Sequence, residues 1–137
     1  MVQDMNNKVI WVTGATSGIG EAAAVHLSQQ GARIVASGRR EERLKTLATR
    51  LPSPHLTIPL DVADETAVFS SAKQITEAFG RIDVLVHSAG LNITERSWDE
   101  ITPSAWNEVI QVDLNGAFYC NQAVLPVMRD QKDGLII

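Results

Sequence analysis

The residues whose types and spacing could do chemistry begin with a glycine-rich run, Thr13-Gly14-Ala15-Thr16-Ser17-Gly18-Ile19-Gly20. It follows an apolar run that predicts a buried strand, and it precedes a predicted helix. Glycines at such a corner permit a tight turn, close approach of the backbone to a phosphate, and close packing of the helix on the strand. The helix N-terminus adds unpaired N–H groups with partial positive charge, and Thr16 and Ser17 add hydroxyl donors. The run therefore predicts a site for the pyrophosphate of a dinucleotide, with a plain strand–turn–helix corner as the alternative.

The elements that must position this run alternate between strand and helix. Continuous apolar runs predict strands buried on both faces, at residues 9–12, 33–37, 56–60, 82–86 and 134–137. Helical spacing and end signals predict the intervening helices, at residues 19–31, 44–51, 64–80 and 102–126. Pro126 is expected to bend or end the last of them. In the first helix the expected buried face consists of Ile19, Ala22, Ala23, His26 and Leu27.

This alternation predicts an α/β fold, a doubly wound parallel sheet with helices on both faces. A length of 137 residues suits one domain, so residues 1–137 are expected to form a single unit. The last strand ends at two isoleucines, Ile136 and Ile137, whereas domains normally end in polar surface segments. We therefore expect a chain truncated after the fifth strand of a larger domain, with a short native C-terminus as the alternative.

The composition excludes several classes of protein and site. Apolar residues make up 45% and charged residues 20% of the chain, as in ordinary soluble proteins, which excludes a disordered chain. The net charge of −4 predicts no broad basic face for nucleic acid or anionic lipid. Cys120 is the only cysteine, which excludes an internal disulfide, and the three histidines show no metal-ligand spacing.

Targeting signals are not seen in the sequence. The first residues lack the basic start and the apolar run of a signal peptide. No apolar stretch reaches the roughly 20 residues needed to span a membrane. The sequence therefore predicts a cytoplasmic protein without membrane, nucleic-acid or metal partners.

Four motifs occur in the order found in the short-chain dehydrogenase/reductase family. The glycine-rich run resembles the cofactor motif of that family, Thr-Gly-x-x-x-Gly-Ile-Gly. Asp61-Val62, after the third strand, resembles its adenine-contacting acid and the neighbour of that acid. His87-Ser88-Ala89-Gly90 resembles its Asn-Asn-Ala-Gly turn with both asparagines replaced, and Val112-Asp113-Leu114-Asn115-Gly116 resembles its Val-Asn-Leu-x-Gly helix motif. The resemblance covers the whole chain.

The resemblance implies a Rossmann-like, NAD(P)-binding domain that is incomplete at its C-terminus. It also implies hydride transfer between a nicotinamide and a small-molecule carbonyl or alcohol, and a homo-oligomer for the complete protein. Asp61 and Val62 are then expected to contact adenine, and Ser88-Ala89-Gly90 to lie against the middle of the cofactor. The expected phosphate-binding residues are Gly14, Ala15, Thr16, Ser17, Gly18, Ile19 and Gly20.

The choice between NAD(H) and NADP(H) depends on the end of the second strand. An acid about 20 residues beyond the glycines would accept a hydrogen bond from the ribose 2′-hydroxyl and repel a 2′-phosphate. At that spacing from Gly18 stands Gly38, which has no carboxylate, and Arg39 and Arg40 follow it. Because guanidinium makes charge-assisted, often bidentate contacts with phosphate, we expect Arg39 to bind the 2′-phosphate and NADP(H) to be preferred. The alternative is that both arginines pair with the two glutamates that follow, or with solvent.

The catalytic set of the resembled family is not found in these residues. That family uses a serine, a tyrosine that gives or takes the proton, and a lysine four residues beyond the tyrosine that lowers its pKa. The one tyrosine, Tyr119, is followed four residues later by Ala123, so we expect it to pack along the long helix. Asp113 stands where the family has a helix asparagine that supports a proton relay. It is the one candidate catalytic residue, and a local hydrogen bond to backbone or solvent is the alternative role.

Three other side chains have structural expectations. Trp98 and Trp106 flank a polar segment and could wall a substrate cleft, but core packing is the expectation for both. Cys120 is expected to be a small buried apolar residue rather than a nucleophile.

The sequence thus predicts the cofactor-binding N-terminal part of an NADP(H)-dependent oxidoreductase of the short-chain dehydrogenase/reductase type. Two alternatives stay open. One is a non-catalytic nucleotide-binding or sensor module, and the other is a fragment without independent function. An apolar fifth strand at the edge of the sheet favours the fragment, because a bare apolar edge promotes aggregation.

Overall fold

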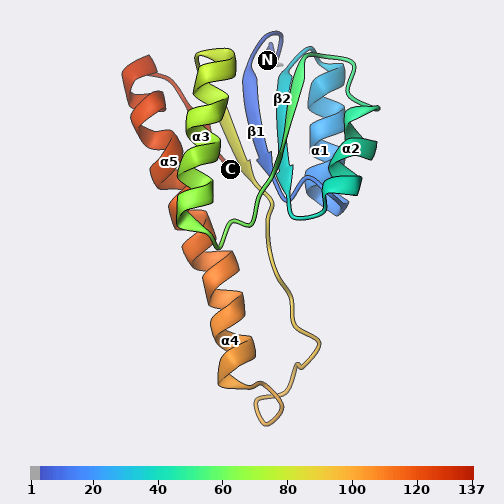
Figure 1. Ribbon diagram of the computed structural model, residues 1–137, viewed down its shortest axis with the longest axis vertical. Coiled ribbons are helices and arrows are strands. Elements are labelled where there is room, and N and C mark those ends of the chain that lie inside the picture. The colour runs from blue at the N-terminus through green and yellow to red at the C-terminus, as the bar shows by residue number, and fades with distance from the viewer. Residues whose placement is uncertain (1–3) are drawn as a thin grey trace.

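Five strands form one parallel sheet, with helices on both of its faces (Figure 1). The structure is a computed structural model that describes residues 4–137. Residues 1–3, at the start of the segment examined for a signal peptide, lie outside the described residues. The strands are β1 (Val9–Thr13), β2 (Arg33–Gly38), β3 (His55–Pro59), β4 (Val84–His87) and β5 (Leu135–Ile136). The helices are α1 (Gly18–Gln29), α2 (Glu41–Ala48), α3 (Glu65–Phe79), α4 (Pro103–Val109), the π-helical η1 (Ile110–Asn115) and α5 (Gly116–Gln131). This arrangement confirms the expected doubly wound α/β fold.

The central strand β1 is buried on both faces, as its continuously apolar sequence predicts. Successive side chains of a strand point to opposite faces of the sheet. Val9 and Trp11 therefore belong to the core that includes residues of α3 and α5, whereas Ile10 and Val12 belong to the core with α1 and α2. None of the four is more than 1% exposed. The two cores fix the position of β1 relative to every helix that covers the sheet.

The strand order β3-β2-β1-β4-β5 places a reversal of direction between β1 and β4. The chain runs outward from β1 through β2 to β3, and then crosses to β4 and β5 on the other side of β1. Thr13, the last residue of β1, lies opposite Ser37 of β2 and His87 of β4. In open parallel sheets a ligand crevice forms at the carboxyl ends of the strands, where the order reverses. The fold therefore places the glycine-rich run, which follows Thr13, at that crevice.

The buried face of α1 differs from the expected one. Ile19 is 81% exposed and His26 is also exposed, whereas Gly20, Ala24 and Ser28 face the interior. Small side chains on the inner face let the helix approach β1 and the glycine-rich run closely. The alanine-rich sequence of α1 gives little contrast between its faces, which is why the spacing pointed to the wrong side.

The long helical segment continues past Pro126, where we expected it to bend or end. It runs through η1 and α5 to Gln131. A proline inside a helix removes the donor to the carbonyl four residues earlier, here that of Gln122. Both Pro126 and Gln122 lie on the exposed side of α5, so water can satisfy the freed carbonyl. Within residues 4–137, none of the helices combines the length and apolar character that crossing a membrane requires.

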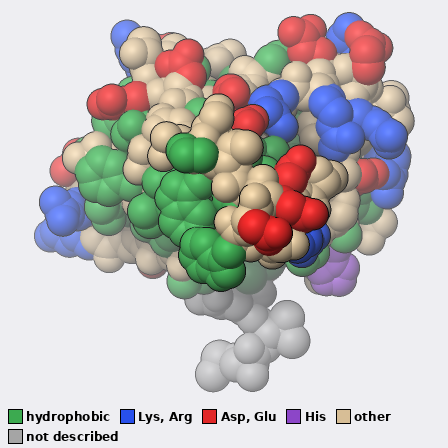
Figure 2. Space-filling model, turned by 90° about the horizontal axis from the view of Figure 1, so that it is seen from below, with side chains coloured by type: hydrophobic (Ala, Val, Ile, Leu, Met, Phe, Trp, Pro, Cys, Tyr) green, Lys and Arg blue, Asp and Glu red, His purple; other side chains and the backbone are tan. Residues whose placement is uncertain are grey.

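Trp98 and Trp106 are not core residues, contrary to expectation. Their side chains are 85% and 48% exposed, and their rings stack on each other with centroids 6.4 Å apart. The reason is that α4 projects away from the sheet and buries none of its residues (Figure 1). Figure 2 views the molecule from the end where α4 projects, and hydrophobic side chains gather on that surface.

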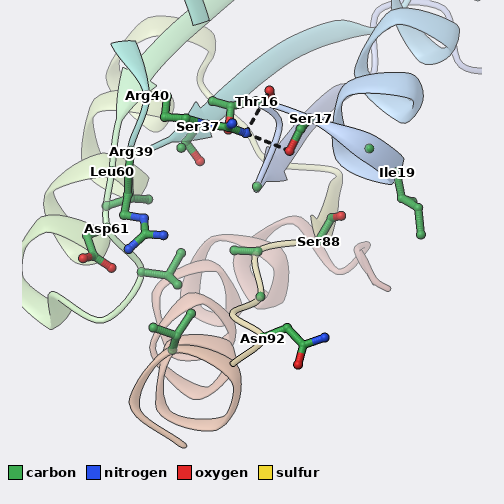
Figure 3. Close-up of a pocket in the computed structure, with 17 residues that line it drawn as sticks. Thr16, Ser17, Ile19, Ser37, Arg39, Arg40, Leu60, Asp61, Ser88 and Asn92 are labelled. Carbon is green, nitrogen blue, oxygen red and sulfur yellow. Dashed lines mark hydrogen bonds between the residues drawn. The ribbon is translucent and has the colours of Figure 1, made fainter. Parts of the chain in front are cut away.

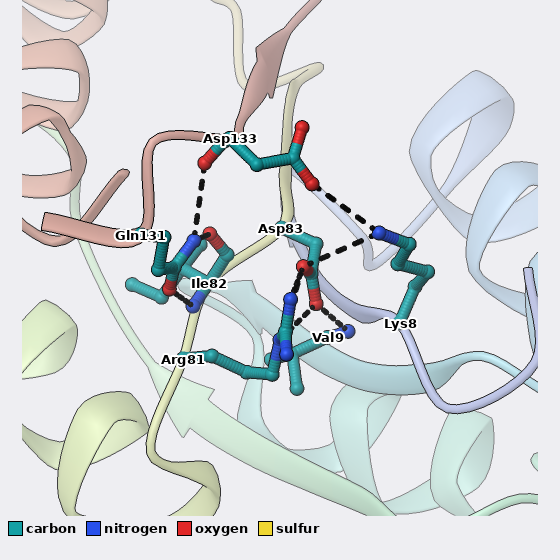
Figure 4. A network of polar contacts seen from close by, with 7 residues as sticks. All are labelled: Lys8, Val9, Arg81, Ile82, Asp83, Gln131 and Asp133. Atoms are coloured by element: carbon teal, nitrogen blue, oxygen red, sulfur yellow. Dashed lines mark hydrogen bonds and ion pairs between the residues drawn. The ribbon is translucent and has the colours of Figure 1, made fainter. Parts of the chain in front are cut away.

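A polar network joins β1 and β4 at their amino ends (Figure 4). The carboxylate of Asp83, 2% exposed, accepts a hydrogen bond of 2.8 Å from the backbone N–H of Val9 and bonds of 2.9 and 3.0 Å from Nε of Arg81. Nζ of Lys8 lies 3.7 Å from the same carboxylate and 3.4 Å from that of Asp133. Burial alone would raise the pKa of Asp83, but the hydrogen bonds from Arg81 and Val9 and the charges of Arg81 and Lys8 outweigh it and lower the pKa. The carboxylate is thus kept ionised where it aligns the two strands.

A second contact at this end fixes α5. The side-chain amide of Gln131 accepts a 3.0 Å bond from the N–H of Ile82 and donates a 2.9 Å bond to its carbonyl. This amide pairs with the backbone as a neighbouring strand would. It sets where the chain leaves α5 to form β5 beside β4.

We predict that Asp83→Asn lowers the free energy of unfolding by about 2 kcal/mol at neutral pH, because hydrogen bonds to a buried charged group contribute about 1.5–3 kcal/mol. The folded-state pKa lies below the ordinary value of 3.8. The stability that this carboxylate contributes is therefore fully present well above pH 3.8 and is lost as the pH falls through the folded-state pKa. Urea unfolding of both proteins at several pH values measures the difference.

The matched control is Asp133→Asn. The side chain of Asp133 is 63% exposed and, among residues 4–137, pairs with Lys8 across the surface, so its loss should cost less than about 0.5 kcal/mol. Equal effects of the two substitutions would contradict the role assigned to Asp83.

Candidate functional site

A cleft of about 800 Å³ opens at the carboxyl ends of the strands (Figure 3). Pockets for small molecules and cofactors usually measure about 300–1,000 Å³, so the size suits an organic ligand. The walls come from the glycine-rich run, the ends of β2 and β3, the loop after β4, and η1. The lining residues are Gly14, Thr16, Ser17, Gly18, Ile19, Ser37, Gly38, Arg39, Arg40, Leu60, Asp61, Val62, Ser88, Ala89, Gly90, Asn92 and Val112.

Two glycines of the run adopt left-handed backbone conformations that other residues rarely take. Gly14 has a φ of +66° and Gly18 a φ of +58°. A Cβ on Gly14 would also lie 2.6 Å from the carbonyl of Ser88 and the N–H of Ala89. At Gly18 the space around such a Cβ is open. The first glycine therefore packs the run against the loop after β4, and the second leaves room for a ligand.

The N-terminus of α1 faces the cleft without a side-chain cap. Ser17 is the N-cap residue in an extended conformation, and its hydroxyl makes no capping bond to the helix. It instead accepts a 2.7 Å hydrogen bond from Nη2 of Arg40. The N–H groups of the first turn consequently have no side-chain acceptor, and they carry the partial positive charge of the helix end. An anion such as a phosphate is the natural partner for such a terminus.

The end of β2 carries two arginines with different surroundings. Arg39 lies in the cleft near Asp61 (Figure 3) and makes no hydrogen bond or ion pair with any residue of the described range 4–137. Arg40 turns back to the glycine-rich run. Neither pairs with the glutamates that follow, and Glu42 pairs with Lys45 at 2.7 Å. Arg39 thus offers an uncompensated guanidinium to the cleft.

The end of β4 is tied to the end of β1 through Thr13. The buried hydroxyl of Thr13 accepts a 3.3 Å bond from the N–H of Ala89 and is hydrogen-bonded at 3.1 Å to Nδ1 of His87. Nε2 of His87 is buried and has no partner among residues 4–137. Burial lowers the pKa of His87, and the charge of Asp113 opposes this shift only in part. His87 is therefore kept neutral as a structural link at the edge of the cleft.

Asp113 lies in the π-helical segment η1 beside the loop after β4. Its Oδ1 accepts a 2.7 Å hydrogen bond from the backbone N–H of Leu91. This is the local backbone bond that was the alternative to a proton relay, and Asp113 does not line the cleft. An asparagine could accept the same bond through its own Oδ1, so the aspartate preserves the contact.

Comparisons with known proteins identify the family to which this fold and cleft belong. Residues 8–137 match the family described as short chain dehydrogenase. The chain belongs to the short-chain dehydrogenase family. It is 40% identical over 133 residues to an uncharacterized oxidoreductase of Staphylococcus epidermidis, covering 97% of this chain and 57% of the relative. It is 36% identical over 134 residues to an uncharacterized oxidoreductase of Staphylococcus aureus, covering 97% and 58%.

Solved structures of the same family superpose on almost the whole chain. A short chain dehydrogenase from Bacillus anthracis is 34% identical with a TM-score of 0.91, covering 98% of this chain and 55% of that one. A metagenomic short-chain oxidoreductase in complex with NADP is 30% identical with a TM-score of 0.91, covering 98% and 61%. The chain therefore spans little more than half the length of these relatives.

The structure brings the expected cofactor-binding and catalytic residues to one cleft, with three exceptions. Ala15 is fully buried in the core with α1 and α2, and Gly20 lies behind the run, where a Cβ would overlap the carbonyl of Gly14. Asp113 is the third exception. Val62 lines the cleft and also packs against Gly116. A Cβ added at Gly116 would lie 2.7 Å from a methyl group of Val62. The motifs thus combine residues that face the cleft with residues that shape its backbone.

Several lining residues were not expected at the site from the sequence. Ser37, Leu60 and Asn92 were not singled out at all, and Gly38, Arg40 and Val112 were noted without being expected to line the cleft. Ligands bind beyond the carboxyl ends of parallel strands, so the lining residues at the ends of β2 and β3 could have been predicted from the positions of those strands. The contact of Arg40 with the glycine-rich run could not have been found in this way, because it depends on a side-chain direction.

Two residues outside the cleft agree with expectation. Cys120 is fully buried, and burial raises the pKa of its thiol to about 12. A thiol that stays protonated is a poor nucleophile. Tyr119 packs on α5 against the core and lies edge-on to Phe118, with ring centroids 6.0 Å apart.

We predict that Gly14→Ala destabilises the folded chain by about 3 kcal/mol. The left-handed conformation and the contact with backbone at 2.6 Å both oppose a methyl group there. Gly18→Ala is the matched comparison, since it has a similar φ but open space around its Cβ. It should cost only about 1 kcal/mol. Denaturant unfolding of both variants decides, and a Gly18→Ala cost as large as that of Gly14→Ala would contradict the packing role of Gly14.

We also predict that His87→Asn flattens the pH dependence of stability just below pH 6.5. The folded-state pKa of His87 lies below the ordinary value of 6.5, so the unfolded chain takes up the proton first. The free energy of unfolding of the parent protein should therefore fall as the pH drops from 6.5 toward the folded-state pKa. Unfolding at a series of pH values measures the slope.

The control for His87 is His55→Asn, since His55 is exposed and far from Thr13. This variant should retain the slope of the parent protein. A His87→Asn protein with an unchanged slope would contradict the assignment.

Proposed function

We propose that the cleft binds NADP(H), and that the chain is the cofactor-binding part of an NADP(H)-dependent oxidoreductase. The observation that carries the proposal is the unpaired guanidinium of Arg39 in the same cleft as the uncapped N-terminus of α1. A dinucleotide with a 2′-phosphate has two anionic groups, and the cleft offers a separate donor set for each. The complex of a metagenomic relative with NADP supports this choice of cofactor.

The backbone of the cleft fits a pyrophosphate. Side chains at Gly14 and Gly20 would overlap neighbouring backbone, so the run stays close to the first turn of α1. Gly18 leaves open space above the helix end. Phosphate oxygens would accept hydrogen bonds from the N–H groups of that turn and from the hydroxyls of Thr16 and Ser17.

The adenosine end would lie between β2 and β3. Gly38 carries no carboxylate that would repel a 2′-phosphate, and Arg39 would bind that phosphate by charge-assisted hydrogen bonds. Asp61 and Val62 would contact the adenine from the end of β3. The Oδ1 of Asp61 already accepts a 3.0 Å bond from the N–H of Ala63, which holds this turn in place.

When bound, the nicotinamide group supplies hydride transfer to a carbonyl or from an alcohol. The chain holds and orients the cofactor, with Ser88, Ala89 and Gly90 against its middle. The same proposal includes a small-molecule carbonyl or alcohol as the substrate. It also includes a homo-oligomeric state for the complete protein and a cytoplasmic location. Asp113 would support the proton relay indirectly, because its bond to the N–H of Leu91 holds the loop after β4 in place. We expect no turnover from residues 1–137 alone, because they contain no tyrosine with a lysine four residues beyond it.

The test is titration of the purified chain with NADPH and NADH, with light scattering to follow its state of association. We expect a monodisperse chain that binds NADPH more tightly than NADH. Arg39→Ala should weaken NADPH binding about 10–100-fold, the loss of charged hydrogen bonds worth about 1.5–3 kcal/mol. NADH binding should change less than about threefold.

Arg43→Ala is the control, because it removes the same charge from exposed positions on α2 and leaves the cleft intact. Binding of neither nucleotide would overturn the proposal. Equal affinities for the two nucleotides would overturn the preference for NADP(H). Binding without turnover, even in the full-length protein, would favour a nucleotide-binding or sensor module.

A further inference from the structure

The side chain of Arg40, just beyond the end of β2, hydrogen-bonds two residues of the glycine-rich run (Figure 3). Its Nε donates to the hydroxyl of Thr16 at 3.2 Å. Its Nη2 lies 2.9 Å from that hydroxyl, 3.1 Å from the carbonyl of Thr16 and 2.7 Å from the hydroxyl of Ser17. The neighbouring Arg39 makes no such contact within residues 4–137. Two adjacent residues of the same type therefore have different partners.

The bond to Ser17 determines what the N-terminus of α1 can bind. A serine at the N-cap normally turns its hydroxyl to the N–H of the second or third helical residue. Here the hydroxyl accepts from Arg40, and the first turn has no side-chain cap. If Arg40 were absent, this hydroxyl could return to the helix and occupy the N–H groups that a phosphate needs. Arg40 thus keeps the helix end open.

The bonds to Thr16 fix the run against the end of β2. A Cβ on Gly38 would lie 2.7 Å from the methyl group of Thr16, so the absence of a side chain at Gly38 lets Thr16 pack there. Arg40 holds the hydroxyl and the carbonyl of the same threonine. The N–H of Ala15, which donates to the carbonyl of Ser37 at 3.0 Å, adds a backbone bond between the run and β2.

We propose that Arg40 is a positioning residue that holds the phosphate-binding run in its ligand-ready conformation. It acts on the pyrophosphate end of the site, which NADPH and NADH share, and not on the 2′-phosphate. The inference rests on the proposed function of the cleft. It divides the two arginines by role: Arg39 selects the nucleotide, and Arg40 strengthens the binding of both.

A direct contact between Arg40 and the 2′-phosphate is the competing role. Its Nη2 and Nε are directed at Thr16 and Ser17, so a phosphate contact would have to replace those bonds or use Nη1 alone. The two roles differ in one measurable quantity, the ratio of the dissociation constants for NADH and NADPH. If Arg40 positions the run, its replacement leaves this ratio unchanged. If Arg40 contacts the 2′-phosphate, its replacement lowers the ratio, because only the dissociation constant for NADPH rises.

The experiment measures NADPH and NADH binding to Arg40→Ala by calorimetry, well below the melting temperature of the variant. A loss of stability alone does not weaken binding under that condition. We expect both dissociation constants to rise about tenfold, with their ratio within about twofold of the parent value. Arg43→Ala, with the same change of charge on the same helix, should leave both constants unchanged within about twofold.

Thr16→Val provides the second variant. It keeps the methyl group against Gly38 and removes the hydroxyl that accepts from Arg40. In a double-mutant cycle its effect should be non-additive with Arg40→Ala and additive with Arg43→Ala. If Arg40→Ala does not fold, Arg40→Lys, which keeps the charge but has one donor group in place of Nε and Nη2, should still weaken both nucleotides by the same factor.

Three results would overturn the inference. They are a loss confined to NADPH in Arg40→Ala, unchanged binding of both nucleotides in that variant, and strict additivity with Thr16→Val. The first would make Arg40 a 2′-phosphate contact and leave the proposed function standing. If the unsubstituted chain binds neither nucleotide, the proposed function is wrong, and this inference falls with it.

Discussion

Burial of β1 between two layers of helices is the constraint on which the rest of the structure depends. Its side chains alternate between two apolar cores, and its edges pair with β2 and β4. A strand so enclosed cannot shift its register by one residue without moving apolar side chains to the wrong core. The end of β1 is therefore a fixed point, and the glycine-rich run begins there.

The two ends of the sheet have opposite polar chemistry. At the amino ends, Asp83 and the positive groups around it form a compensated network that aligns β1 with β4. At the carboxyl ends, within residues 4–137, the first turn of α1 has no side-chain cap and the guanidinium of Arg39 has no hydrogen-bond acceptor. A compensated network stabilises the fold, whereas unpaired donors in a cleft remain available to a ligand. The fold thus separates the polar groups that hold it together from those available for binding.

The departures from the family motifs preserve geometry. His87 stands in place of an asparagine and joins β4 to Thr13 through Nδ1. Asp113 stands in place of another and holds the N–H of Leu91 through Oδ1. His87 thus bonds a side chain of β1, and Asp113 supplies an acceptor to a backbone N–H. Both replacements add an ionisable group next to the cleft. Burial lowers the pKa of His87, so its ring stays neutral at neutral pH.

The sequence by itself determined the alternation of strands and helices, the glycine-rich run and the absence of an acid at Gly38. These features are local, because apolar periodicity and glycine spacing act over a few residues. The tertiary structure alone decided which face of α1 is buried, that Trp98 lies in solvent, and that Arg40 turns toward Ser17. Each of these depends on the shape of a distant segment: the close approach of α1 to β1, the projection of α4, and the meeting of the β2 end with the run after β1. Sequence spacing fixes what a segment can form, but contacts between segments far apart in the chain decide which of its faces meets a partner.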